Sequence, residues 1–195
     1  MARRPRGPRP RRERPGAGPV AVRAGRARPR GHGRDAVTPD ETAFRDALGR
    51  FASGITVITS VDDAGRPAGF ACQSFASLSL DPPLVLFCVA RTSTSWPKLA
   101  ATGRFAVNVL AADQRDVCRA FAVSGGDKFA GLAWTRSPHG TAHLDGALAT
   151  VDCTVADVHE AGDHLIVVGS VRELDARDGG GPLLYYRGRY AAADV

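Results

Sequence analysis

Short segments rich in β-branched residues recur along this chain of 195 residues and are separated by turn-forming residues. Residues 55–61 are almost all β-branched, and the following Asp62-Asp63-Ala64-Gly65 predicts a hairpin turn before a second strand near Pro67. Five further segments are candidate strands: 84–90, 105–110, 149–158, 165–174 and 183–190. Six or seven strands without regular strand-helix alternation predict a mainly β fold, an antiparallel barrel with helical insertions.

Three segments carry helix signals. Thr38 is the expected N-cap of a first helix, and Gly54 its expected end. At helical spacing, one face of this helix is apolar and holds Phe44, Leu48 and Phe51. Short helices are also predicted over 96–102 and 112–122.

The basic charge of the chain is concentrated in its first 36 residues. They contain twelve Arg against Glu13 and Asp35, so residues 37–195 carry a net charge of −4 although the whole chain carries +6. Without Leu, Ile or aromatic residues, 1–36 cannot bury enough apolar surface to fold, and we predict a disordered tail before one domain at 37–195. The tail could hold phosphates, but a solvated tail or a stretch translated upstream of the natural start is favoured, so we expect no nucleic-acid partner.

Cysteine and histidine spacing excludes the common metal sites. The four cysteines, at 72, 88, 118 and 153, form no CxxC pair and lie among apolar residues, which is typical of free thiols in a reducing cytoplasm. His139 and His143 are four residues apart, but Pro138 and Gly140 favour a turn there, so no metal is expected. The longest apolar run, 84–90, is too short to span a membrane, and no secretory signal is recognisable.

The usual nucleotide and hydrolase motifs are missing from the sequence. It has no GxGxxG after a strand, no GxxxxGK[ST], no GxSxG and no HExxH. A cofactor would therefore need another kind of site.

Two segments could supply such a site. Hydroxyl residues Ser74, Ser77 and Ser79 stand beside small residues and could hydrogen-bond a flat heterocycle. Residues 91–95 place an arginine and four hydroxyl side chains just before the helix expected at 96–102, a combination that suits a phosphate group. A solvated Ser/Thr loop with an ordinary helix cap is the alternative reading of 91–95.

Many blocks, in a fixed order, resemble the flavin reductase family of FMN-binding split barrels. The resemblance covers about residues 42–190, and among its blocks are Gly69-Phe70, Ser77-Leu78-Ser79-Leu80-Asp81-Pro82-Pro83, Phe105-Ala106-Val107-Asn108-Val109-Leu110, Asp127-Lys128-Phe129 and Gly162-Asp163-His164. Ala71 departs from the family pattern, which usually has Thr at this position. A flavin hydrogen bond would be lost there.

The resemblance implies a set of site residues. Those expected beside the flavin ring and ribityl chain are Gln73, Ser74, Phe75, Ala76 and Ser77. Those expected at its phosphate are Arg91, Ser93, Thr94 and Ser95, and Phe121, Lys128 and Phe129 would border the site. Nicotinamide binding is implied for Gly162, Asp163 and His164, with Tyr186 of the last strand beside them and His164 as the residue acting in catalysis. The ordinary alternative for His164 is a loop histidine at a strand end.

The resemblance also implies a function. It predicts a cytoplasmic homodimer that reduces FMN or FAD with NADH or NADPH and passes the reduced flavin to a separate monooxygenase. Hydride passes between the two cofactors themselves, so the scarcity of acid-base motifs is no objection. Two alternatives stay open, a non-catalytic flavin-binding or sensory split barrel and an oxidase with its own tightly bound flavin.

Overall fold

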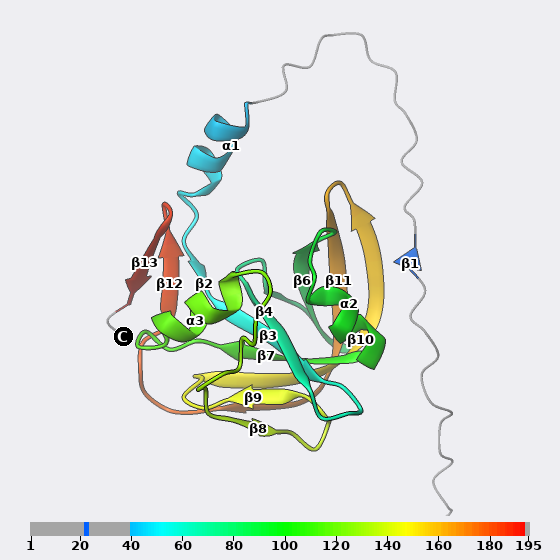
Figure 1. The fold of residues 1–195 in the computed structure, drawn as a ribbon. Helices are drawn as coiled ribbons and strands as arrows, with labels where there is room; N and C mark the ends of the chain where they lie inside the picture. The colour runs from blue at the N-terminus through cyan, green and yellow to red at the C-terminus, as the bar shows by residue number, and fades with distance from the viewer. Residues whose placement is uncertain (1–21, 24–39, 194–195) are drawn as a thin grey trace, which may run out of the picture.

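The computed structural model describes Val22–Arg23 and residues 40–193 (Figure 1). Seven strands form one continuous path in the order β4-β3-β7-β10-β11-β6-β5, and every pairing along it is antiparallel. Their bounds are β3 (Thr56–Val61), β4 (Pro67–Cys72), β5 (Ala76–Leu80), β6 (Pro83–Ala90), β7 (Arg104–Val109), β10 (Ala149–Ala161) and β11 (His164–Ala176). The predicted mainly β, antiparallel architecture is confirmed.

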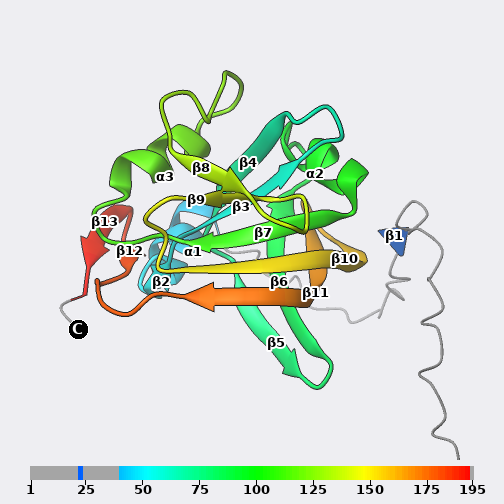
Figure 2. The same cartoon turned by 90° about the horizontal axis from the view of Figure 1, so that it is seen from below.

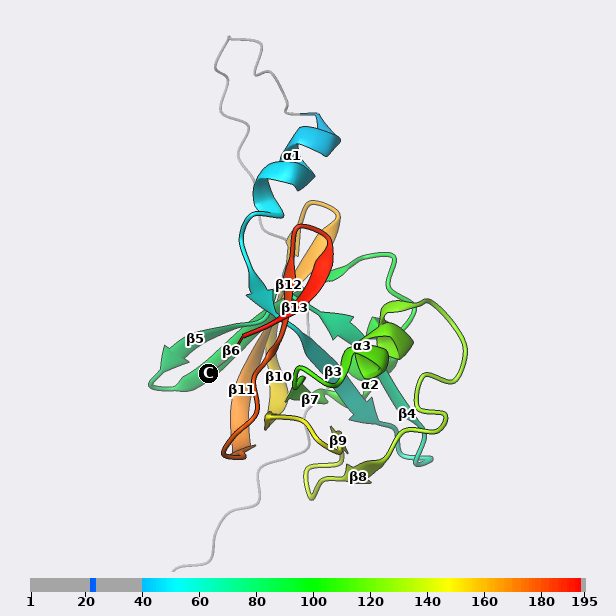
Figure 3. The same cartoon turned by 90° about the vertical axis from the view of Figure 1, so that its left-hand side faces the viewer.

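The path is open, because β4 and β5 are its two ends. Figures 2 and 3 show the β5–β6 hairpin standing out from the curved body that the other strands form. The sequence prediction missed β5 because Ala76–Leu80 lacks the β-branched residues typical of a strand.

Short strands complete the fold. β1 (Val22–Arg23) lies parallel to Val158 and His159 of β10, and it is the one described part of the predicted tail. β8 (Trp134–Arg136) and β9 (Ala142–Leu144) form a ribbon, and β2 (Ser53–Gly54), β12 (Leu183–Tyr186) and β13 (Arg189–Ala192) form a small sheet. The single strand predicted over 183–190 is therefore wrong. Arg187 and Gly188 both have positive φ and turn the chain back as a hairpin.

The helices are α1 (Glu41–Leu48), α2 (Trp96–Thr102) and α3 (Arg115–Ala122). The N-cap of α1 is Asp40, whose carboxylate accepts hydrogen bonds from two backbone N–H groups, so the prediction of Thr38 as the cap is wrong; Thr38 itself lies outside the described residues. The helix ends at Gly49, not Gly54, because Ser53–Gly54 pairs with β12. The helix predicted over 96–102 is confirmed as α2. α3 starts at Arg115 and not at residue 112, because the backbone N–H of Ala112 donates a hydrogen bond to the carbonyl of Gly181.

Two apolar clusters fill the interior. One surrounds Phe87, whose ring meets Phe70, Trp96 and Phe105 edge to face at centroid distances of 5.1–5.9 Å. The other contains Ile55, Leu110, Phe121, Phe129 and Leu183 among its buried residues. Residues of β3 alternate between the clusters, as a strand with both faces buried requires.

Within the part of the chain that is described, no helix is long and apolar enough to cross a membrane. All four cysteines are free thiols, as the sequence predicts. His139 lies in the turn between β8 and β9 and faces Glu173, whereas His143 lies on β9 and faces Asp152. The two imidazoles therefore have different carboxylate partners.

Candidate functional site

A cavity of about 460 Å³ lies where β4, β6, α3 and the β12–β13 hairpin meet. Its volume is within the range of small-molecule sites, about 300–1,000 Å³. Four of the residues predicted from the sequence line it: Gln73, Ser74, Ser93 and His164. We call this space the main cavity.

Ser74 fixes one wall of the main cavity. Its hydroxyl accepts a hydrogen bond from the backbone N–H of Cys88 at 2.9 Å and donates to the carbonyl of the same residue at 3.0 Å. The Sγ atom of Cys72 lies 3.3 Å from the same hydroxyl. Ser74 thus joins the segment after β4 to the middle of β6, and a ligand would meet a wall that is already fixed.

His164 enters the main cavity from the start of β11. Gly162 has a φ of 62° and makes the tight turn from β10, and Asp163 accepts a hydrogen bond from the His164 ring at 2.8 Å through Nδ1. This bond from His164 lowers the pKa of the Asp163 carboxyl. Because Nδ1 is engaged, Nε2 is the ring atom left for a ligand.

Arg91 lies near this corner but outside the main cavity. Its backbone N–H donates to the Asp163 carbonyl, and its guanidinium lies 3.5 Å from the carboxylate of Glu160. The Arg91 side chain is half exposed, so this ion pair is weak. The structure therefore does not bring Arg91 to the other residues predicted at the phosphate.

Of those residues, Ser93 lines the main cavity, whereas Thr94 and Ser95 lie at a separate cluster around Lys128. The Lys128 ammonium donates at 3.3 Å to each of three oxygens, the Ser95 hydroxyl and the carbonyls of Gly69 and Phe121. Burial, together with the charge of nearby Lys98, lowers the pKa of Lys128. Thr94 and Ser95 line a second, smaller cavity of about 70 Å³ beside this ammonium.

Phe121 and Phe129 are part of the supporting core. Both are buried, and their rings pack edge to face with centroids 4.9 Å apart. Phe121 also packs so closely on Gly69 that a Cβ at that position would lie 2.9 Å from its ring. The two aromatic side chains shape the wall behind β4.

The remaining predicted residues lie outside the main cavity. Phe75 packs partly against the first core cluster, whereas Ala76 and Ser77 are exposed on β5. Tyr186 is exposed and lines a different surface hollow with Arg187 and Arg189.

Among the lining residues outside the predicted set are Cys118 and Tyr190. The Tyr190 hydroxyl lies 3.5 Å from the Cys118 Sγ, and the Arg115 guanidinium lies 5.0 Å from the Tyr190 ring centroid. The hydrogen bond with Cys118, followed by burial, raises the pKa of Tyr190 to about 12. The ring centroids of Tyr185 and Tyr190 lie 5.5 Å apart, so a packed pair of tyrosine rings forms one wall.

The chain is similar to a described family and to characterised proteins. Residues 48–194 match the family described as flavin reductase like domain. The reductase subunit HsaB of a flavin-dependent monooxygenase from Rhodococcus jostii is 50% identical over 155 residues, which are 80% of this chain and 79% of that protein. A flavin reductase from Pseudomonas putida is 46% identical over 151 residues, 77% of this chain and 89% of that protein.

Solved structures show the same likeness. Nitrilotriacetate monooxygenase component B from Mycobacterium thermoresistibile is 50% identical, with a TM-score of 0.77 over 80% of this chain and 87% of that chain. The NADH:FAD oxidoreductase SgcE6 of Streptomyces globisporus, in complex with NAD and FAD fragments, is 34% identical, with a TM-score of 0.74 over 78% of this chain and 92% of that chain. The chain therefore belongs to the flavin reductase like family, and it is an oxidoreductase of the flavin reductase type.

Proposed function

We propose that this protein uses NADH or NADPH to reduce FMN or FAD and supplies the reduced flavin to a separate monooxygenase in the cytoplasm. The observation that carries the proposal is the main cavity, whose walls are an aromatic pair, His164 and backbone, next to the lysine-serine cluster of Lys128 and Ser95. The relatives, the monooxygenase reductase subunit HsaB among them, support the monooxygenase partner. Four free thiols support a reducing compartment.

The residues present fit a flavin mononucleotide group. The Lys128 ammonium has only neutral oxygen partners among the described residues, so a phosphate would supply the anion that its charge lacks. The main cavity, with few charged side chains, suits a flat heterocycle. When flavin and nicotinamide are bound, the two groups supply the hydride chemistry themselves.

The residues of this chain then bind the two cofactors, orient their rings and shield them from water. Lys128 and Ser95 hold the phosphate end, and Ser74 keeps the wall at Gln73 fixed. Tyr185 and Tyr190 bound the ring region and exclude water, which favours transfer between closely stacked rings. His164 donates or accepts a hydrogen bond through Nε2 at the nicotinamide.

We propose that the working unit is a homodimer. Phe44, Leu48 and Phe51 of the α1 region are exposed by 54%, 58% and 80%. Together with Gln73 and Tyr185, they line a surface hollow of about 410 Å³. A second copy covering α1 would therefore also close over residues that line the main cavity.

A direct assay tests the proposed function. Purified protein, mixed with NADH or NADPH and added FMN or FAD, is expected to consume the nicotinamide, followed by absorbance at 340 nm, at a rate that depends on added flavin. Flavin binding without any nicotinamide oxidation would favour the sensory alternative. Turnover by a tightly bound flavin, with no response to added flavin, would favour the oxidase.

A further inference from the structure

The chain contains only two lysines, Lys98 and Lys128, against 24 arginines, and both line the second cavity. Neither forms an ion pair with another residue in the described ranges, although ten such pairs are found elsewhere. The two ammonium groups are close enough for the charge of Lys98 to lower the pKa of Lys128. Two like charges held together, with no ion pair to a described residue, favour an anionic ligand.

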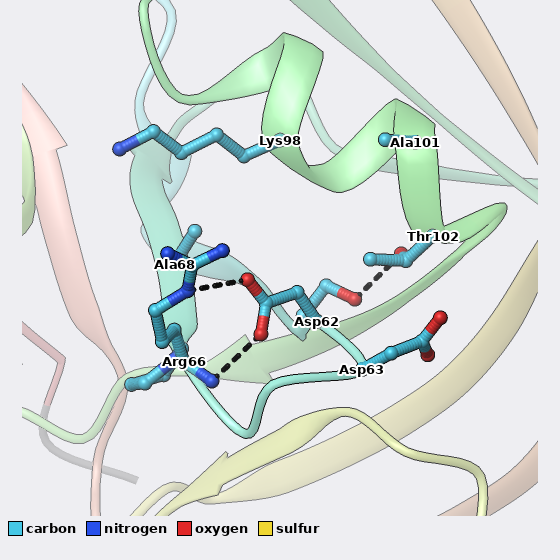
Figure 4. A pocket seen from close by; sticks show the side chains of 9 residues that line it. Asp62, Asp63, Arg66, Ala68, Lys98, Ala101 and Thr102 are labelled. Carbon is cyan, nitrogen blue, oxygen red and sulfur yellow. Dashed lines mark hydrogen bonds and ion pairs between the residues drawn. The ribbon is translucent and has the colours of Figure 1, made fainter.

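The second cavity continues into a third one. The third cavity has a volume of about 450 Å³ and lies between α2 and the hairpin that joins β3 to β4 (Figure 4). Pro67, Ala68 and Lys98 line both cavities, so the two spaces adjoin along the start of β4. We call the combined second and third cavities the lysine groove.

The lysine groove and the main cavity follow the same edge of the sheet. β4 is an end strand of the path, the main cavity borders Phe70–Cys72, and the groove borders Pro67–Gly69. Six residues of β4 extend over about 20 Å at roughly 3.3 Å each. A ligand along this edge would be elongated, with one end in the main cavity and the other beyond Lys98.

Charge changes along the groove. The second cavity holds both lysines and Asp127, whereas the third holds Asp62 and Asp63 against Arg66 and Lys98. Asp62 is already engaged, since its carboxylate accepts two hydrogen bonds from Arg66, one from the side-chain Nε at 2.8 Å and one from the backbone N–H at 2.9 Å. The third cavity is thus polar and close to neutral. Its lining includes Thr102 (Figure 4), whose hydroxyl is hydrogen-bonded to that of Ser60.

We propose that the lysine groove binds the adenosine diphosphate end of FAD, which makes FAD the preferred flavin of this reductase. The inference rests on the proposed function, because the isoalloxazine must occupy the main cavity. Lys128 and Ser95 hold the phosphate that FMN and FAD share. Lys98 pairs with the second phosphate, and the neutral adenosine lies between Ala68 and Ala101 in the third cavity.

This arrangement distinguishes FAD from the other nucleotides in the reaction. FMN ends at its single phosphate and leaves the third cavity empty, so it gains nothing from Lys98. An extra 2′-phosphate, as in NADPH, would meet a third cavity that is close to neutral and whose Arg66 is already paired with Asp62, so it would gain little there.

The test compares binding of FMN and FAD by titration, without turnover. Lys98→Ala is expected to raise the dissociation constant for FAD about tenfold and to leave that for FMN within about twofold. Ala101→Phe puts a large ring into the third cavity from an exposed position on α2, and it is likewise expected to weaken the binding of FAD but not that of FMN. Arg136→Ala, which removes one exposed cation from β8, is the control and should change neither constant.

Equal weakening of FMN and FAD, or unchanged FAD binding in both groove variants, would overturn the proposal. So would a rise in the Michaelis constant for NADPH alone, which would assign the groove to the nicotinamide nucleotide. If the protein binds FAD in this selective way but oxidises no nicotinamide, the proposed function fails and the groove assignment stands.

Amine labelling offers a measurement on the unaltered chain. Acetylation with an amine reagent, mapped by peptide mass, reports almost solely on Lys98 and Lys128 because they are the only lysines. FAD is expected to protect Lys98 and FMN to leave it reactive. Equal labelling of Lys98 with either flavin would contradict the proposed arrangement.

Discussion

Asp152 is a carboxylate that is 1% exposed, beneath the β8–β9 ribbon. Its oxygens accept hydrogen bonds from Ser137 and Thr141, and the Nε2 atom of His143 lies 2.9 Å away. Burial alone would raise the pKa of Asp152, but the hydrogen bonds from His143, Thr141 and Ser137 outweigh it and hold the pKa below its ordinary value. The network is therefore a stabilising element that depends on an ionised carboxylate.

Asp152→Asn is expected to lower the unfolding free energy at pH 7 by about 1–3 kcal/mol. The folded state binds the Asp152 proton more weakly than the unfolded chain, so this contribution is present above about pH 4 and is lost as the pH falls through the folded-state pKa. Denaturant titrations at pH 7 and pH 3 measure both effects, and the variant should lose less stability on acidification. Exposed Asp113→Asn is the control. Equal stability of Asp152→Asn and the parent at pH 7 would contradict the prediction.

His164→Ala is expected to raise the Michaelis constant for NADH and to leave flavin affinity within about twofold, because the ring enters the main cavity where the nicotinamide is proposed. An Asn at this position should retain part of the effect if a hydrogen bond matters. His159→Ala is a matched control, since both imidazoles are 45% exposed and each lies beside an Asp, but His159 does not line the main cavity. Normal kinetics for both substrates in a folded His164→Ala protein would return His164 to an ordinary loop role.

At the scale of elements, β11 has one position in its pairing with β10, Gly169, that only glycine fits. A Cβ at Gly169 would overlap the Phe105 ring and lie 3.2 Å from the Cys153 Cβ. Gly169→Ala should therefore cost about 1–3 kcal/mol of unfolding free energy, measured by denaturant titration, because the core must shift to admit it. Gly54→Ala, where nothing lies within 4 Å, is the control and should be close to neutral. A neutral Gly169→Ala would show that the Phe105 ring can move aside freely.

Elements with strong local signals could be predicted from the sequence. β3 has a nearly continuous β-branched run, and α2 has Pro97 in its first turn and Gly103 in the left-handed conformation after its end. Elements defined by their partners could not. β5 has small, polar residues and becomes a strand because it pairs with β6. The first helix ends earlier than predicted because Ser53–Gly54 pairs with β12, and this partner is too distant in sequence to be recognised from local signals.

The same division applies to the candidate site. Ser74 and His164 could be found because they lie in short, recognisable segments beside strand ends. The contact between Tyr190 and Cys118 could not be predicted, because it depends on the β12–β13 hairpin returning beside α3 over a separation of 72 residues. The sequence neighbours of Arg91 predict a phosphate contact, whereas in the structure its guanidinium lies beside Glu160 of the β10–β11 hairpin.

At the scale of the whole molecule, the arginine-rich segment is expected to be dispensable for the reaction. Of residues 1–36, the structure describes only Val22–Arg23, which pair with two residues of β10 away from the main cavity. Deleting residues 1–36 should therefore leave flavin reduction at 340 nm and the association state unchanged. A truncated protein that loses either property would show that this segment is part of the working fold.

The proposed homodimer can be tested at α1, because this helix buries none of its residues within the single chain. Leu48→Asp combined with Phe51→Asp should therefore leave the subunit folded while placing two charges on the apolar surface that a second copy would cover. Sedimentation should shift from dimer to monomer, and the flavin dissociation constant should rise about tenfold because Gln73 and Tyr185 lose their cover.

Leu174→Asp combined with Val123→Asp provides the matched control, since these side chains are also exposed, by 68% and 59%, but do not line the hollow beside α1. In Figure 3, β11, which carries Leu174 near its end, finishes at the opposite end of the molecule from α1. The control should remain dimeric with normal flavin affinity. A dimer that survives the α1 substitutions would place the subunit contact elsewhere, and a monomer that binds flavin normally would show that each subunit completes its own site.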